Sequence, residues 1–294
     1  MQTLDSLKRR INSAEDLQSI VRTMKALAAV SIRQYEKAVE SLVEYNRTTE
    51  LSLHVVLTDR GQELLEEEKK PGGRVGAIIF GSDQGMCGQF NDVIADYALS
   101  NLIEMGISED KWMLMSVGIR VDGRLQDAGY PVQKHLSLPG SVSGISSKVQ
   151  TMVMTLDAWR LNRGVNTVYL FYNRPTSGAT YRPTTVRLLP IDVERLRSME
   201  TKTWPSHILP TFTMDRQRLL RALIRQHLFV LSFRAFAESL ASENAARLSA
   251  MQSAEQNIDD RLLLLNQEYH GLRQNSITSE LLDIVSGFEV LTSG

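Results

Sequence analysis

The stretch "SENAARLSAMQSAEQNIDDRLLLLNQEYHGLRQNSITSELLDIVSGFEVL", from Ser242 to Leu291, contains no proline. The proline-free region already begins at Thr211, and over its roughly 80 residues only Gly271 and Gly287 interrupt a helix-forming composition before the last residue. At about 1.5 Å per residue, an unbroken helix of that length would exceed about 100 Å, several times the width of a small domain. Such a helix cannot be buried in a core of its own, so it needs a partner elsewhere in the chain.

The N-terminal arm offers that partner, because its apolar residues recur in steps of three and four, the spacing of a coiled-coil seam. These residues are Leu4, Leu7, Ile11, Ala14, Leu17, Val21, Met24, Ala28, Ile32, Tyr35, Val39 and Leu42. The C-terminal arm has the same rhythm at Ile258, Leu262, Leu265, Tyr269 and Leu272, and resumes it at Ile277, Leu281, Ile284, Phe288 and Leu291. We expect the two stripes to bury each other as an antiparallel helix pair.

The middle of the chain differs, since all eight prolines lie between residues 71 and 210. Its strand-like runs are RVGAIIF, KWMLMSVG, VQKHLSL, NTVYLFYN and YRPTTVRLLPID, and SSKVQTMVMTLDAWRLN reads as a helix. Strands that alternate with helices predict an α/β layer with a mainly parallel sheet and a hairpin at its edge.

The expected fold class is therefore α/β plus long coiled coil, an antiparallel pair of N- and C-terminal helices with a Rossmann-like α/β middle domain. We expect an N-terminal coiled-coil arm at 1–60, a linker at 61–73, the middle domain at 74–210 and the long C-terminal coiled-coil arm at 211–294. The segment EEEKKPGG combines charge, proline and glycine, which is typical of a solvated linker.

Composition limits the classes of partner. Lysine and arginine total 33 against 34 acidic residues, which argues against binding nucleic acid or an anionic membrane by bulk charge. The apolar runs are far shorter than the roughly 18 residues that span a bilayer. The single cysteine, Cys87, excludes an internal disulfide, and no leader pattern opens the chain. We expect a cytoplasmic protein whose partners are proteins.

The segment IIFGSDQGMCGQFN, Ile78 to Asn91, resembles the setting of a dinucleotide site because a buried strand ends in a glycine-rich turn. Its glycines, Gly81, Gly85 and Gly88, are spaced i, i+4 and i+7, whereas the dinucleotide fingerprint requires i, i+2 and i+5. No Gly-Lys-Ser/Thr motif occurs in the chain. A strand-to-helix turn is the favoured interpretation over a nucleotide site, and we expect no cofactor.

Catalytic patterns are also missing. The five histidines show no metal-ligand spacing, and GSVSG has Val142 where a nucleophile elbow needs serine. Cys87 has no histidine near it in sequence, so a buried thiol is favoured over a nucleophile. We expect no catalytic residue and no metal site.

Longer motifs carry a resemblance. The stretch LKRRINSAEDLQSIVRTMKALAAVSIR begins with Lys-Arg-Arg-Ile and continues with Met-Lys-x-x-Ala-Ala, and the C-terminal arm contains Arg-Gln-x-x-Ile-Thr-x-Glu-Leu-x-Asp-Ile-Val-x-Gly. Together with SENAARLSAMQSAEQN, they resemble the arms of the gamma subunit of F-type ATP synthases. The glycine loop is similar to the Gly-Leu-Cys-Gly-x-x-Asn loop of that family, which is a structural turn. The resemblance spans the whole chain in a consistent order.

This resemblance implies a non-catalytic central-stalk rotor subunit, whose paired arms turn inside a ring of alternating alpha and beta subunits. The implied partners are the alpha and beta subunits of the catalytic ring, the epsilon subunit and the membrane c-ring, with no nucleic acid and no direct membrane insertion. The implied location is peripheral, on the cytoplasmic side of a prokaryotic cell membrane, because a chloroplast-type cysteine insert and a mitochondrial leader are absent.

The same resemblance implies roles for particular residues. The expected contacts with the catalytic ring are Met24, Arg247, Gln274, Thr278 and Glu280. The expected apolar bearing tip consists of Ile284, Val285, Phe288 and Leu291. For Arg9, Arg10 and Lys25, a ring contact and a solvated helix face both stay open.

The chain departs from the family pattern in two places. DLQSIV, Asp16 to Val21, replaces the usual Asn-Thr-Gln-Lys-Ile-Thr, and Met86, Gln89 and Phe90 replace more usual loop residues. These changes fit a divergent or duplicate version of the enzyme. Two other readings stay open: an NAD-linked α/β enzyme with helical dimerisation arms, and a passive coiled-coil scaffold.

Overall fold

The structure is a computed structural model that describes residues 3–57, 73–176, 180–191 and 211–292, with side chains described up to residue 285. It divides into two compact units: unit 1 comprises Met1–Ala28 and Leu248–Gly294, and unit 2 comprises Ala29–Arg247. The long helices α1 (Leu4–Ser41) and α8 (Arg216–Thr292) contribute residues to both units.

Unit 1 is an antiparallel pair formed by α1 and α8. The apolar side chains of Leu7 and Ile11 pack with Leu265. Further along α1, Gln18 donates a hydrogen bond to Asp259, and the guanidinium Nε of Arg22 lies 3.0 Å from the Glu255 carboxylate. Residue numbers rise along α1 as they fall along α8, so the predicted antiparallel pairing is confirmed.

One predicted seam position of α1 is wrong. Leu17 is 54% exposed, and Gln18 is the half-buried side chain that faces α8 and bonds to Asp259. Four residues after Ala14, Gln18 lies closer to the same face of the helix than Leu17 does, because a helical turn is 3.6 residues. The seam therefore admits a polar residue here, and an apolar side chain is left in solvent.

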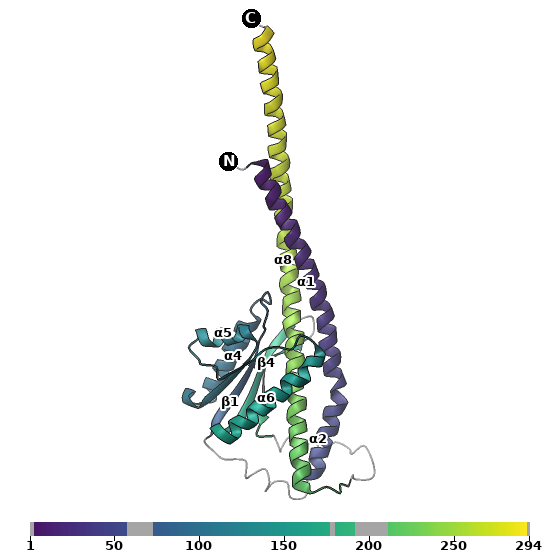
Figure 1. The fold of residues 1–294 in the computed structure, drawn as a ribbon, viewed down its shortest axis with the longest axis vertical. Helices are drawn as coiled ribbons and strands as arrows, with labels where there is room; N and C mark the ends of the chain where they lie inside the picture. The colour runs from purple at the N-terminus through teal and green to yellow at the C-terminus, as the bar shows by residue number, and fades with distance from the viewer. Residues whose placement is uncertain (1–2, 58–72, 177–179, 192–210, 293–294) are drawn as a thin grey trace. The chain divides into compact units, whose positions relative to one another are not determined.

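The C-terminal part of α8 has no helix beside it within unit 1. Packing against α1 extends to Leu272, and α8 continues beyond the start of α1 at Leu4 (Figure 1). As a result Ile277 is 49% exposed and Leu281 is 58% exposed, although both continue the apolar rhythm. The prediction that the C-terminal stripe is buried against the N-terminal one is therefore wrong for Ile277 and Leu281.

Unit 2 is built on a five-stranded sheet of order β3-β2-β1-β4-β5. Strands β1 (Arg74–Phe80), β2 (Trp112–Val117), β3 (Lys134–Leu136) and β4 (Val165–Thr176) run parallel, and β5 (Thr180–Leu189) pairs antiparallel with β4. The predicted parallel sheet with an edge hairpin is confirmed. Buried residues occupy nearly every position of β1 and β2, as expected for strands covered on both faces.

Helices cover both faces of the sheet (Figure 1). On one face, α4 (Phe90–Glu104) and α5 (Ile119–Asp127) pack on Ala77 and Ile79. On the other, α6 (Val142–Arg163) and α8 pack on Ile78 and Phe80. Because successive side chains of β1 point to opposite faces of the sheet, this strand contributes to two hydrophobic cores. A short 3-10 helix, Glu109–Lys111, precedes β2.

The N-terminal arm is not one helix. Helix α1 ends at Ser41, Leu42 forms a turn, and α2 (Val43–Leu57) continues the arm. Leu53, Val56 and Leu57 of α2 pack with Leu220 of α8. The linker expected at 61–73 lies outside the described residues except for Gly73.

Candidate functional site

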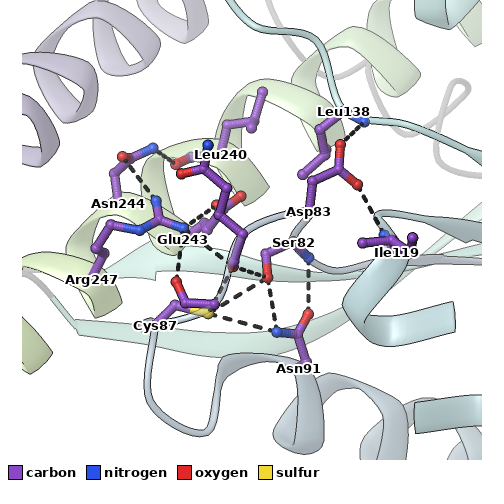
Figure 2. A network of polar contacts seen from close by, with 12 residues as sticks. Ser82, Asp83, Cys87, Asn91, Ile119, Leu138, Leu240, Glu243, Asn244 and Arg247 are labelled. Atoms are coloured by element: carbon purple, nitrogen blue, oxygen red, sulfur yellow. Dashed lines mark hydrogen bonds and ion pairs between the residues drawn. The ribbon is translucent and has the colours of Figure 1, made fainter. Parts of the chain in front are cut away.

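The glycine loop between β1 and α4 is held by its own side chains (Figure 2). The backbone N–H of Ser82 donates to Asn91 Oδ1 at 2.9 Å, and Asn91 Nδ2 donates to Ser82 Oγ at 2.9 Å. Gly118, at the end of β2, has φ 108°, and a Cβ there would lie 2.8 Å from the Ser82 backbone. Only glycine permits this approach.

Asp83 places a negative charge where the loop meets α5. Its carboxylate accepts the backbone N–H of Ile119 at 2.9 Å and that of Leu138 at 2.8 Å (Figure 2). The N-terminus of a helix in this position would otherwise attract a phosphate. Because a carboxylate of the chain already uses these donors and would repel an anion, the geometry favours the structural-turn interpretation over a nucleotide site.

Arg247 of α8 anchors this loop from the other side. Its Nη2 donates to Glu243 Oε1 at 2.6 Å and reaches the carbonyl oxygens of Gln84 and Gly85 at 3.4 and 3.5 Å. Its Nη1 donates to Asn244 Oδ1 at 3.3 Å. Cys87 and Phe90 pack on Ala246 beside this contact. The loop and α8 therefore form one structural feature of unit 2.

The electrostatics of this contact are unbalanced. Burial raises the pKa of Glu243, the nearby guanidinium of Arg247 opposes the rise, and the charge of Asp83 adds to it. Burial also raises the pKa of Tyr35, with a further contribution from Glu243. Among the described residues, Glu243 Oε2 and Arg247 Nε have no hydrogen-bond partner. The hydrogen bonds of Glu243 and Arg247 therefore compensate only part of the free-energy cost of burying their charges.

Tertiary contacts also bring a serine, a histidine and an aspartate together. Ser116 Oγ donates to Asp122 Oδ1 at 2.7 Å and lies 3.1 Å from His135 Nδ1. In a catalytic triad the histidine stands between the serine and the carboxylate, whereas here Ser116 stands in the middle and is fully buried. This arrangement stabilises the edge of the sheet and cannot activate the serine.

The predicted ring-contact residues fall in both units. Arg247 is only 7% exposed, and its guanidinium is engaged inside unit 2 as described above. Met24 of α1 is half-buried in unit 1, whereas Gln274, Thr278 and Glu280 of α8 are exposed. Gln274 and Thr278 lie one turn apart, and the Thr278 hydroxyl donates to the Gln274 carbonyl at 2.9 Å.

The predicted bearing tip is described in part. Ile284 is 67% exposed and Val285 is 54% exposed, so both present apolar surface to solvent. Phe288 and Leu291 belong to α8, but their side chains lie outside the described residues.

Lys25, for which two readings stayed open, pairs inside the chain. Its ammonium group and the guanidinium of Arg22 both contact the Glu255 carboxylate. The hydrogen bond from Lys25, and to a smaller extent the one from Arg22, lowers the pKa of Glu255 below its ordinary value. The sequence did not identify Glu255. The i, i+3 spacing of Arg22 and Lys25 places both on one face of α1, but it does not locate their partner on α8.

A comparison with protein families decides what kind of chain this is. A family model described as ATP synthase matches residues 3–291. The chain belongs to the ATP synthase family. Within the described residues of this ATP synthase family member, no cluster of histidine, cysteine or carboxylate groups could hold a metal ion. None of the helices in the described ranges combines the length and the hydrophobicity that a membrane span requires.

Curated relatives of this family member match over nearly their whole length. The ATP synthase gamma chain of Geotalea uraniireducens (strain Rf4) is 29% identical in an alignment over 292 residues that covers 98% of this chain and 99% of that relative. The ATP synthase gamma chain of Anaeromyxobacter sp. (strain Fw109-5) is 28% identical over 314 residues, covering 99% of this chain and 100% of the relative.

Solved structures share the fold. The rotor of the Euglena gracilis mitochondrial ATP synthase in rotational state 1 gives a TM-score of 0.62 at 16% identity, covering 93% of this chain and 98% of that one. The central stalk and c-ring of the Tetrahymena thermophila mitochondrial ATP synthase gives 0.54 at 18% identity, covering 80% and 99%. The long helix pair with an α/β domain is thus the fold of rotor chains, and the predicted fold class is confirmed.

Proposed function

We propose that this chain is the central-stalk gamma subunit of an F-type ATP synthase. It transmits torque between the ion-driven membrane c-ring and the catalytic ring of alpha and beta subunits. The observation that carries the proposal is the family match over residues 3–291, supported by gamma-chain relatives that align over nearly their full length. The chain itself carries out no catalysis and binds no nucleotide.

The helix pair of unit 1 suits a shaft. A single helix of this length bends easily, whereas two helices packed along a seam brace each other. Ion pairs between α1 and α8, such as Arg22 with Glu255, resist sliding of one helix along the other. At the end of α8 the exposed apolar side chains Ile284 and Val285 offer a surface that turns against a partner without strong directional bonds.

The contact residues are part of the same proposal. Met24 contacts the catalytic ring directly. So do Gln274, Thr278 and Glu280, whose polar side chains can form and release hydrogen bonds as the ring changes shape. Arg247, engaged within unit 2, acts on coupling through the loop that it holds. The epsilon subunit and the c-ring bind the chain outside the ring, on the cytoplasmic side of the cell membrane.

Assembly is the first test. Alpha and beta subunits are co-expressed with and without this chain, native mass spectrometry measures the composition of the complex, and ATP hydrolysis is assayed. We expect one copy of this chain per ring of alternating alpha and beta subunits, and steady hydrolysis that depends on it. If several such subunit pairs form no complex while the purified chain binds a dinucleotide, the alternative of an NAD-linked α/β enzyme replaces the proposal. If the chain joins the complex without any effect on ATP hydrolysis, the alternative of a passive coiled-coil scaffold replaces the proposal instead.

The contact residues are tested in the assembled complex. Gln274→Ala is expected to lower ion transport coupled to ATP hydrolysis, and Gln267→Ala is the matched control, because it makes the same change on the exposed surface two turns earlier on α8. Helical content of both chains must equal that of the wild type. Equal coupling in the two variants would remove Gln274 from the contact set.

A further inference from the structure

A buried carboxylate of α8 joins this helix to the sheet of unit 2. The side chain of Glu238 is 4% exposed. Its Oε2 accepts hydrogen bonds from the hydroxyl of Tyr172 at 2.8 Å and from Nε of Arg174 at 3.0 Å. Its Oε1 accepts one from Nε of Arg234 at 2.7 Å. Tyr172 and Arg174 belong to β4 and Arg234 to α8, so one carboxylate bridges the two elements.

The partners of Glu238 are themselves held in place by further contacts. Arg174 Nη2 donates to the Tyr172 hydroxyl at 2.7 Å, and its guanidinium lies 5.6 Å from the centre of the Tyr172 ring. Arg234, one turn before Glu238 on the same helix, fixes the orientation of the carboxylate. Both carboxylate oxygens of Glu238 have hydrogen-bond partners, whereas Oε2 of Glu243 has none among the described residues. Charge-assisted bonds with all partners in place make a stiff contact.

The network adds a directional constraint to an apolar interface. Beside the network, the rings of Phe80 and Phe236 pack edge to face with their centroids 4.9 Å apart, and this contact holds α8 against the sheet. Apolar contact is non-directional, whereas hydrogen bonds weaken steeply when their geometry changes. Because a side-chain carboxylate lies about 6 Å from a helix axis, a rotation of α8 by about 30° would move it by about 3 Å. Such a rotation would break both bonds from β4.

We propose that Glu238, with Tyr172 and Arg174, is the joint that passes torque between the α/β domain and α8. This role rests on the proposed function, in which the α/β domain is driven by the membrane ring while α8 turns within the catalytic ring. Tyr172 and Arg174 are positioning residues, since they act by fixing the angle of α8. Weakening the joint should therefore matter under load and leave unloaded hydrolysis unchanged.

The test uses the whole complex in sealed vesicles. Tyr172→Phe and Arg174→Met each remove one bond from β4 to Glu238, and a double variant removes both. The first control is Tyr97→Phe, which removes the hydroxyl of α4 that accepts a hydrogen bond from Thr185 of β5. The second is Arg225→Met, which breaks an exposed ion pair between Arg225 of α8 and Asp157 of α6. Hydrolysis is measured with the gradient collapsed by an ionophore, and the largest gradient sustained by ATP is measured with proton- and sodium-sensitive dyes.

Folding of each variant is checked in the purified full chain. Cys87 is 2% exposed in unit 2, so thiol labelling reports opening of that unit. We expect wild-type labelling rates in all variants. In the three joint variants we expect faster amide exchange in α8 around Glu238, by roughly tenfold or more for the loss of a charged hydrogen bond. If the double variant labels rapidly, Tyr172→Phe, which removes one oxygen atom, decides the question.

The expected result is that the joint variants hydrolyse ATP like the wild type with the gradient collapsed but lose the ability to sustain the wild-type gradient, whereas both controls sustain it. A joint variant that sustains the wild-type gradient overturns the proposed joint and leaves the proposed function intact. A wild-type complex that assembles without any ATP-driven gradient overturns the proposed function, and the joint with it.

Discussion

Nη2 of Arg247 lies 2.6 Å from Oε1 of Glu243, one turn earlier on α8, and their side chains are only 8% and 7% exposed. Two buried charges at this distance stabilise each other, but each has lost its hydration. Removing one partner leaves the other without compensation. The same guanidinium reaches the loop carbonyls of Gln84 and Gly85, so the pair determines how the loop lies on α8.

Arg247→Met is therefore expected to lower the free energy of unfolding of the chain by about 3–5 kcal/mol, the usual effect of breaking a buried ion pair. The double variant Arg247→Met/Glu243→Gln should lose less, because no uncompensated charge remains in it. Urea unfolding followed by circular dichroism measures both. Equal losses in the single and double variants would show that the orphaned carboxylate is not the source of the effect.

Stability should depend on pH through Glu243. Its pKa is raised above the ordinary value of 4.5 by burial. At pH values between 4.5 and the raised pKa, the folded chain binds more protons than the unfolded chain. The contribution of Glu243 to the free energy of unfolding is therefore fully present below the ordinary pKa and is lost as pH rises through the raised pKa. The groups that face it are Arg247, Asp83 and Tyr35.

Glu243→Gln should remove this dependence. The free energy of unfolding of the wild type, minus that of the variant, is expected to fall as pH rises, with a slope of at most about 1.4 kcal/mol per pH unit for one proton. Urea unfolding at a series of pH values above 4.5 gives the two curves. Parallel curves would contradict a raised pKa for this carboxyl group.

Asp83 is expected to stabilise the fold through its two backbone bonds. Asp83→Ala leaves the N–H groups of Ile119 and Leu138 without their acceptor and should lower the free energy of unfolding by about 1–3 kcal/mol. Amide exchange at these two residues should rise. Asp127→Ala is the control, because the side chain of Asp127, also on α5, is exposed. Unchanged exchange in Asp83→Ala would mean that water replaces the carboxylate without loss.

The seam of unit 1 can be tested with two leucines that are close in sequence. Leu265 is 2% exposed and packs with Leu7 and Ile11, whereas Leu263 is 61% exposed. Leu265→Ala should destabilise the helix pair by about 2–4 kcal/mol, seen as faster amide exchange in α1 near Leu7, and Leu263→Ala should change stability by less than about 0.5 kcal/mol. Similar effects of the two substitutions would argue that α1 and α8 do not pack through this seam.

Much of the fold could be predicted from local patterns. The absence of proline predicted both long helices. The steps of three and four predicted their antiparallel pairing, because residues at this spacing lie on one face of a helix and form an apolar stripe. The alternation of strand and helix gave the parallel sheet with its edge hairpin. Leu17 was placed wrongly because it is apolar and lies three residues after Ala14, whereas the geometry of the pair turned Gln18 toward Asp259.

The candidate site was less predictable. The motifs identified the glycine loop and Arg247 separately, but not their contact, since the residues are far apart in sequence. Glu243 and Arg247 have the i, i+4 spacing of a helical ion pair, a signal that was available in the sequence. For Glu238 the same spacing pointed only to Arg234, because its other two partners, Tyr172 and Arg174, lie on β4.

The sequence by itself determined the two proline-free arms, the α/β middle domain and the resemblance to one family, since each depends on residues that are neighbours along the chain or on motifs. Only the tertiary structure decided which polar groups meet: Asp83 with the backbone of Ile119 and Leu138, Arg247 with the loop, and Glu238 with Tyr172 and Arg174. The physical reason is that burial and hydrogen-bond geometry depend on distances in space, and separation along the chain does not fix those distances.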